Sequence, residues 1–185
     1  MKEPNDTLRD EHEIIERLLF ALDGLADHIR YDKDFPERDI EEALGIAVEF
    51  ADWCHHAKEE FVLFPALRKA SPRRGGEIAR RLTSDHMAFR KLVKAMRNAV
   101  PLAAIEDGPP RAHLAKELGL YTRLVREHIR IEEQRLLPEV ERSLGRRDRA
   151  AIAAEFDRLE KMEGEPGRHR RFEDAIRRLA VAYAV

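Results

Sequence analysis

Residues 55–65 read HHAKEEFVLFP, and residues 128–138 read HIRIEEQRLLP. Both stretches place a His four residues before the first of two Glu, then an apolar residue three positions on and a Pro two beyond that. Each half of the chain also begins with an acidic residue followed closely by a His, in DEHEIIERLL at 10–19 and SDHMAFRKLV at 84–93. The duplication indicates two similar halves within one chain.

The apolar residues recur with helical spacing along the chain, and no stretch alternates as a β-hairpin would. This pattern predicts four long helices, with boundaries marked by Pro36, by the segment Pro72 to Gly76 and by Pro101, which is expected to end the third helix. The expected ranges are about 6–30, 37–70, 77–99 and 110–144. With short connections, these helices form an all-α, up-down-up-down four-helix bundle.

The C-terminal part continues the helical pattern beyond the four long helices. Residues 147–183 predict two shorter amphipathic helices, broken at GEPG, residues 164–167. We therefore expect a bundle domain at residues 1–146 and a helical extension at residues 147–185. The extension is expected to pack on the bundle or to form the interface of a homodimer.

The composition excludes several classes of partner. Lys and Arg number 34 and Asp and Glu number 36, so the charges nearly cancel and no strong field favours nucleic acid or an acidic membrane surface. No apolar run approaches the roughly 20 residues of a membrane span, and the first residues lack the apolar stretch of a signal peptide. Cys54 is the single cysteine, so no intrachain disulfide is expected. We expect a cytoplasmic protein.

Polar residues take core positions in all four expected helices. Each apolar stripe includes one His, and two of these His are followed four residues later by a Glu, which shares their helix face. Helical phase leaves the choice between His55 with Glu59 and His56 with Glu60 open. The repeat favours the first pair, since His55 and His128 stand at the same distance from the next Pro. The set is His12, His55, Glu59, His86, His128 and Glu132.

A metal centre explains such a set better than a structural role for each residue. Burying carboxylates among imidazoles is costly unless a cation organises them. The mixture of nitrogen and oxygen donors suits iron, and also manganese or zinc. The sequence therefore predicts a metal site inside the bundle.

The duplicated phrase and its flanking His residues resemble the hemerythrin-like family of HHE cation-binding proteins over about residues 8–144. The resemblance implies a four-helix bundle around a non-haem di-iron centre, with two ions joined by an oxo or hydroxo group. It also implies that the six residues above are the ligands, with Glu59 and Glu132 as the bridging carboxylates.

Two positions differ from the oxygen-carrying hemerythrins, which have His-x-x-x-His on the third helix and an Asp five residues after the His on the fourth. Here Arg90 stands four residues after His86, and Glu132 stands four after His128. The pattern is closer to the bacterial stress-related variants. The protein and one shared oxygen supply about ten of the about twelve bonds of two six-coordinate ions, so each ion is expected to keep one open position. Further candidates for a ligand or its hydrogen-bond partner are Glu16, His56 and Tyr121.

Open positions on a redox metal allow small molecules to bind. The expected function is therefore to bind, sense or turn over O2, peroxide or nitric oxide in a stress response. One alternative is a non-enzymatic iron or redox sensor whose extension reports metal loading to a partner protein, and another is reversible oxygen storage. A metal-free helical adaptor would leave both copies of the phrase unexplained.

Overall fold

The computed structural model describes residues 2–31, 34–162 and 168–183, and all of its regular structure in these ranges is helical. Besides α-helices (α), three segments are π-helical (η), with hydrogen bonds from residue i to i+5. None of the helices described is long and apolar enough to cross a membrane. The elements are α1 (Pro4–Tyr31), α2 (Glu37–Ile46), η1 (Ala47–His56), η2 (Glu59–Leu63), α3 (Phe64–Ala70), α4 (Arg74–Ile105), α5 (Pro109–Ile131), η3 (Glu132–Leu136), α6 (Leu137–Ser143), α7 (Arg146–Met162) and α8 (Arg168–Ala182).

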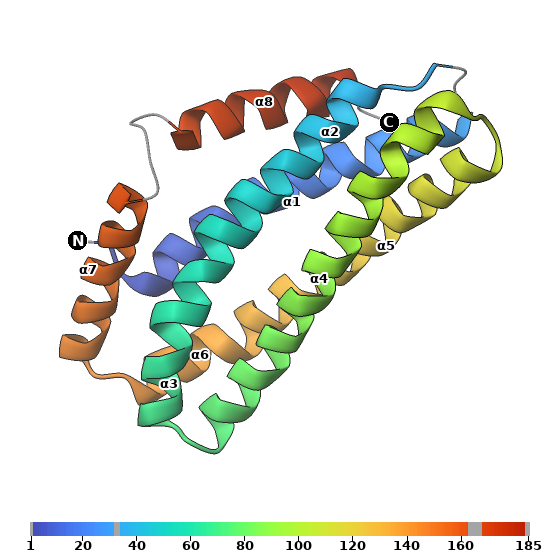
Figure 1. The fold of residues 1–185 in the computed structure, drawn as a ribbon. Helices are drawn as coiled ribbons and strands as arrows, with labels where there is room; N and C mark the ends of the chain where they lie inside the picture. Colours follow the sequence, from blue (N-terminus) through green and yellow to red (C-terminus); the bar gives the residue numbers. More distant parts are fainter. Residues whose placement is uncertain (1, 32–33, 163–167, 184–185) are drawn as a thin grey trace.

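These elements form four long rods and two outer helices. The run from α2 through η1 and η2 to α3 is one continuous rod, as is the run from α5 through η3 to α6 (Figure 1). Together with α1 and α4 they make the bundle, while α7 and α8 lie against its outside (Figure 1). The prediction of an all-α bundle with additional C-terminal helices is confirmed.

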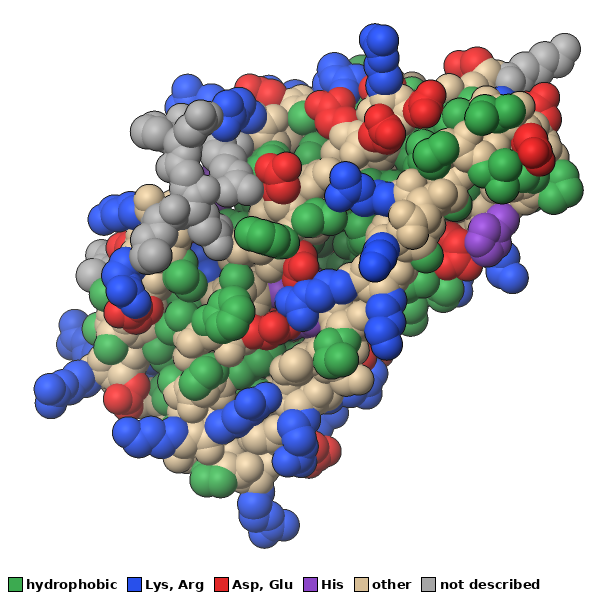
Figure 2. Space-filling view, in the orientation of Figure 1, with side chains coloured by type: hydrophobic (Ala, Val, Ile, Leu, Met, Phe, Trp, Pro, Cys, Tyr) green, Lys and Arg blue, Asp and Glu red, His purple; other side chains and the backbone are tan. Residues whose placement is uncertain are grey.

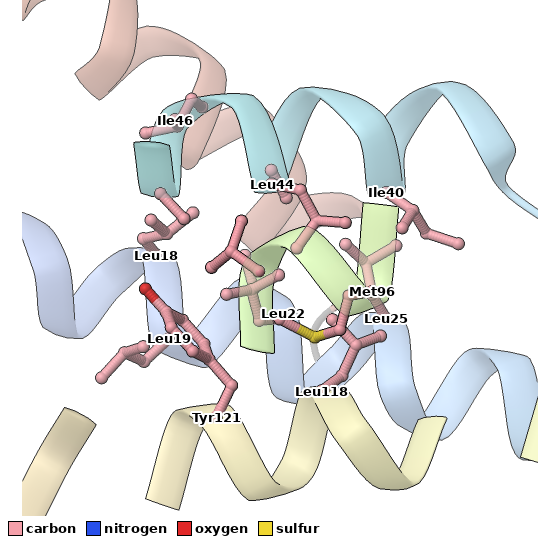
Figure 3. Packing of buried hydrophobic residues seen from close by; sticks show 14 of the residues in the cluster. Leu18, Leu19, Leu22, Leu25, Ile40, Leu44, Ile46, Met96, Leu118 and Tyr121 are labelled. Carbon is pink, nitrogen blue, oxygen red and sulfur yellow. The ribbon is translucent and has the colours of Figure 1, made fainter. Parts of the chain in front are cut away.

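Two apolar clusters fill the bundle, one toward each end. The larger includes Leu18, Leu19, Leu22 and Leu25 of α1 and side chains of α2, α4 and α5, among them Leu44, Met96, Leu118 and Tyr121 (Figure 3). The smaller joins Leu8 to the buried residues of α3, α4 and α6, and to α7. The buried His and Glu residues lie between the two clusters in sequence on each rod. The bundle therefore encloses a polar layer between two apolar layers.

The third rod differs from the prediction at both ends. Pro101 does not end it, because α4 continues to Ile105. A Pro removes the hydrogen bond to the carbonyl four residues back, and here that residue is Arg97, whose side chain is exposed. Burial of Val100 and Ala103 on the opposite face favours continuation of the helix.

The start of α4 lies earlier than expected, because Gly75 and Gly76 belong to its first turn. The Oγ of Ser71 accepts a hydrogen bond from the backbone N–H of Gly75 at 3.2 Å, which begins the helix directly after α3. A Cβ at Gly75 would press on Leu67, so the missing side chain allows the two helices to turn closely.

The extension packs on its own bundle. α8 lies along α1 and α2, and α7 contacts α1 and η2 (Figure 1). At the end of α8, Arg178 and the Tyr183 hydroxyl both donate hydrogen bonds to Asp39 of α2, at 2.9 and 2.5 Å. The predicted break at residues 164–167 lies outside the described residues, between α7 and α8.

The close contact between α8 and α1 at Gly24 gives a stability prediction. A Cβ at this position would collide with the backbone carbonyl of Tyr183, whereas a Cβ at Gly45 in α2 would meet no atom within 4 Å. We expect Gly24→Ala to lower the free energy of unfolding by about 1–3 kcal/mol. Gly45→Ala is expected to raise it by about 0.5–1 kcal/mol, since Ala suits a helix better than Gly. Urea denaturation of both variants measures the difference, and equal effects would contradict the contact.

Candidate metal centre

Both copies of the duplicated phrase change to π-helical geometry at the same residue. Glu59 begins η2 and Glu132 begins η3, and their carbonyls accept hydrogen bonds from Phe64 and Leu137, five residues on. A Pro then stands in the first turn of the next α-helix in each copy. Because Pro has no backbone N–H, it cannot donate a hydrogen bond to a carbonyl of the preceding turn. Each π-helical turn therefore lies where the series of α-helical hydrogen bonds is already interrupted. π-helical turns of this kind are frequent at functional sites.

All six predicted ligands lie buried in the middle of the bundle, and their donor atoms form two sets. In the first set, named site A, His12 of α1 and His55 of η1 face Glu132 of η3. The Nε2 atoms of His12 and His55 lie 3.1 and 3.9 Å from Oε2 of Glu132. Site A therefore has two imidazoles and one carboxylate.

Site B contains Glu59 of η2, His86 of α4, His128 of α5 and, again, Glu132. Nε2 of His128 lies 2.7 Å from Oε1 of Glu132, and Nε2 of His86 lies 3.4 Å from Oε2 of Glu59. The two Nε2 atoms are 3.0 Å apart. Glu132 thus presents one oxygen to each site, the arrangement of a bridging carboxylate, while Glu59 belongs to the set of site B.

Several atoms of this cluster are buried without a hydrogen bond. Among the described residues, these are the Nε2 atoms of His12 and His55 and both carboxylate oxygens of Glu59 and Glu132. Each unsatisfied buried polar group costs about 1–3 kcal/mol. Because the atoms point at one another in two sets of nitrogen and oxygen donors, cations placed among them would satisfy all of them. The residues present therefore fit metal ions.

The other ring nitrogen of each imidazole is held by a second carboxylate. Nδ1 of His12 lies 2.8 Å from Glu133, and Nδ1 of His55 lies 2.9 Å from Glu11. Nδ1 of His86 lies 2.7 Å from Glu60, and Nδ1 of His128 lies 3.4 Å from Asp85. A carboxylate on Nδ1 fixes the ring and leaves Nε2 as the nitrogen for a metal. All four imidazoles are thus oriented toward the cluster.

These four carboxylates were not predicted as functional, although the sequence repeats them. Glu11 and Asp85 each precede the His of the first helix in their half, and Glu60 and Glu133 each follow the predicted ligand Glu. Within each half, the first acidic residue supports the His of the duplicated phrase. The last Glu supports the His at the start of the other half. Their matching places in the two halves are the signal that identifies them.

The charges in the metal-free cluster shift its pKa values in opposite directions. Burial lowers the pKa of His55, but the hydrogen bond with Glu11 and the nearby carboxylates of Glu132 and Glu59 raise it to about 10. Burial also lowers the pKa of His128, and Glu132 and Asp85 raise it to about 9. Burial and the charge of Glu132 raise the pKa of Glu59. Without metal, protons on the imidazoles balance the buried carboxylates.

A buried lysine connects site A to the extension. Nζ of Lys58, a residue only 1% exposed, donates hydrogen bonds to Glu11 at 2.5 Å and to Sγ of Cys54 at 3.1 Å. It also lies 3.0 Å from Oε1 of Glu160 in α7. Burial lowers the pKa of Lys58, but the charge of Glu11 more than compensates and raises it. Glu11 therefore links His55 to the buried ammonium of Lys58, which in turn pairs with Glu160 of α7.

Removal of the Glu11 charge tests this connection. Glu11→Gln leaves the Lys58 ammonium buried with a weaker partner, and losing one member of a buried pair costs about 3–5 kcal/mol. We expect a loss of this size in the free energy of unfolding of the metal-free protein, measured with urea. Lys58→Met should restore part of it in the double variant. An additive double variant would mean that the two side chains do not interact.

The three further candidates lie in different places. Glu16 is not brought to the cluster: its side chain is 44% exposed and lies 3.3 Å from Arg126. Tyr121 is buried, its ring stands edge-on to that of Phe89, and burial raises its pKa. His56 is buried beside site B, and burial together with the neighbouring imidazoles lowers its pKa well below the usual value.

A cavity of about 650 Å³ opens between the α2–η1 rod and α4. Its lining includes His56 and Tyr121 together with Val48, Phe89 and Arg90. Figure 2 shows the hollow on this face, with hydrophobic side chains on its floor and Lys and Arg along the α4 side. The lining reaches His56, the buried residue beside site B, but includes none of the residues of site A or site B.

Comparison with known proteins places these features in a family. The model of the hemerythrin HHE cation binding domain matches residues 3–140. Similar curated proteins are the uncharacterized proteins Mb2018 of Mycobacterium bovis and MT2051 and Rv1995 of Mycobacterium tuberculosis, each 30% identical over 173 residues. The match covers 93% of this chain and 63% of each relative, so the chain spans less than two thirds of their length. No solved structure matches the chain. The family model and the two His and Glu clusters together indicate metal-ion binding.

Proposed function

Because the chain belongs to the hemerythrin HHE cation-binding domain family, we propose that it holds two iron ions, one at each site, and binds, senses or turns over O2, peroxide or nitric oxide. The observation that carries this proposal is the pair of donor sets that share Glu132, with buried nitrogen and oxygen atoms that lack hydrogen-bond partners. The stress-related role inferred from the Arg90 and Glu132 positions is part of the same proposal.

The side chains have distinct tasks in this function. Bound iron would supply a redox-active Lewis acid at which a small oxidant can bind. Glu132 holds the two positions together, and the carboxylates on Nδ1 keep each imidazole aimed and basic. The apolar layers on both sides of the cluster exclude water from it. The protein thus provides a dry, preorganised set of donors with fewer protein ligands than two ions require.

Metal analysis tests the proposal directly. We expect protein purified without added metal to contain about two irons per chain. The double variant His55→Ala/His128→Ala should lose them, while His113→Ala, a change at an exposed residue, should keep them. Optical spectra recorded during addition of O2, peroxide or nitric oxide then identify the reacting molecule. Protein that takes up no iron, or a double variant with unchanged metal content, would overturn the proposal.

A sensor function is supported by one further observation, the chain of contacts from His55 through Glu11 and Lys58 to Glu160 of α7. Metal binding at His55 changes the charge at the start of this chain. If the protein is a sensor, hydrogen exchange of residues 146–161 should differ between the metal-free and metal-loaded forms. Identical exchange in the two forms would leave turnover or storage as the function.

A further inference from the structure

The cavity between the α2–η1 rod and α4 has the features of a binding site that is separate from the metal centre. Its volume of about 650 Å³ falls within the range of small-molecule sites in proteins. Such sites combine an apolar lining with a few polar groups that orient the ligand. We propose that the cavity binds a small aromatic carboxylic acid that carries a hydroxyl group at the end opposite its carboxylate.

Cationic side chains of α4 form one wall of this cavity (Figure 2). Arg90 is already paired, since its guanidinium lies 2.7 Å from Asp52 and 2.9 Å from Glu60. Lys94 and Arg97 follow on the same face of the helix. Within the described ranges, neither of them takes part in a hydrogen bond or an ion pair. These two side chains are therefore available to hold an acidic group.

The charge of the lining favours a carboxylate over a phosphate. The cavity is lined by the three cations Arg90, Lys94 and Arg97 and by the two carboxylates Glu41 and Asp52, which leaves one positive charge in excess. A phosphate monoester carries about 1.5 to 2 negative charges at pH 7. A single carboxylate therefore balances the lining more closely.

The floor of the cavity suits a flat apolar body. Val48, Phe89, Val93 and Tyr121 contribute to it. The rings of Phe89 and Tyr121 stand edge-on, with centroids 6.1 Å apart and an interplanar angle of 81°. An aromatic ligand can extend this pair by stacking on one ring and meeting the edge of the other.

The hydroxyl of Tyr121 provides a second polar contact at the floor. The side chain is 2% exposed and lines the cavity, and in Figure 3 its ring extends from α5 toward α2. In the part of the chain that the structure describes, this hydroxyl makes no hydrogen bond, although a buried Tyr usually has a partner for its O–H. It can donate to a hydroxyl oxygen of the ligand.

The two polar contacts lie at opposite ends of the cavity, which sets the direction of the ligand. Tyr121 packs against Phe89, and Arg97 lies eight residues further along α4, about 12 Å along the helix axis. Asp52 pairs with Arg90 at the Phe89 end and would repel a carboxylate there. The carboxylate of the ligand therefore lies near Arg97, and its hydroxyl group lies near Tyr121.

Calorimetric titration of the full chain with three related compounds tests this assignment. The probe is 6-hydroxy-2-naphthoate, 2-naphthoate lacks the hydroxyl group, and the methyl ester of the probe lacks the charge. We expect the probe to bind saturably at a single site. The unhydroxylated acid should bind about threefold more weakly or worse, and the ester about tenfold more weakly or worse.

Two variants assign these preferences to named side chains. Lys94→Gln/Arg97→Gln should weaken binding of the probe by about tenfold or more. Its matched control, Arg80→Gln/Lys91→Gln, removes the same charge from exposed positions of α4 outside the lining and should bind as wild type. Tyr121→Phe should bind the probe and 2-naphthoate equally well, because the group that distinguishes them is gone. Thermal melts show whether each variant folds.

Three results would overturn the proposal. They are wild-type protein that binds none of the three compounds, a Lys94→Gln/Arg97→Gln variant with wild-type affinity, and a folded Tyr121→Phe variant that still prefers the hydroxylated acid. No residue of site A or site B lines the cavity. Each of these results would therefore leave the proposal of two irons standing, and the metal analysis described above tests that proposal separately.

Discussion

Glu132→Gln is expected to reduce tightly bound metal from about two ions per chain to fewer than one. Each oxygen of this carboxylate faces a different site, Oε2 toward His12 at 3.1 Å and Oε1 toward His128 at 2.7 Å. The amide keeps the shape of the side chain but replaces one oxygen by an NH2 group and removes the negative charge. Both sites therefore lose a ligand through one substitution.

Two further substitutions make this result specific. Glu59 belongs to the set of site B, so Glu59→Gln should lose about one ion and keep the other. Glu127→Gln alters an exposed Glu of α5 that pairs with Arg130, and this variant should retain both ions. Elemental analysis after desalting gives the metal content, and thermal melts of the metal-free proteins show whether each variant folds. Two retained ions in Glu132→Gln would contradict a shared carboxylate.

The fold and the convergence of six side chains could be predicted from the duplicated phrase, but the neighbouring residues could not. The prediction chose His55 over His56 by its distance from a Pro. In the structure Cys54, His55 and His56 are all buried. They lie at the end of η1, where the 100° step of an α-helix does not hold. Helical phase therefore fails where the π-helical turns occur.

Side-chain contacts between different helices of the bundle could not be predicted from the sequence pattern either. Glu60 contacts His86 and Glu133 contacts His12 because of how far neighbouring helices are shifted along one another. Periodicity along a single helix does not specify this shift. Lys58 is a similar case. A Lys is almost never fully buried unless paired, and its partners Glu11 and Glu160 come from α1 and α7. Such residues are identified by tertiary contacts.

Metal loading is expected to raise the thermal midpoint by about 8–16 °C. A ligand present at about a thousand times its dissociation constant stabilises the native state by about 4 kcal/mol. In a chain of this size each kcal/mol raises the midpoint by about 2–4 °C. Bound metal would also pair the buried nitrogen and oxygen atoms that lack a hydrogen bond, and so remove their unfavourable contribution to the folded state. These atoms belong to His12, His55, Glu59 and Glu132. Calorimetry with and without a chelator measures the shift, and equal midpoints would mean that no ion binds the native cluster.

The same loading should release about two protons per chain at pH 7. In the metal-free fold the pKa of His55 is raised to about 10 and that of His128 to about 9, from an ordinary 6.5. A raised pKa stabilises the metal-free fold fully below pH 6.5, and this contribution is lost as the pH rises through 9 to 10. At pH 7 both imidazoles therefore hold a proton that the metal must displace, so metal affinity should increase between pH 6 and 8. Titration calorimetry in buffers of different ionisation enthalpy counts the protons. An affinity independent of pH over this range would mean that both imidazoles are already neutral, and that the buried carboxylates of the empty site are balanced in some other way.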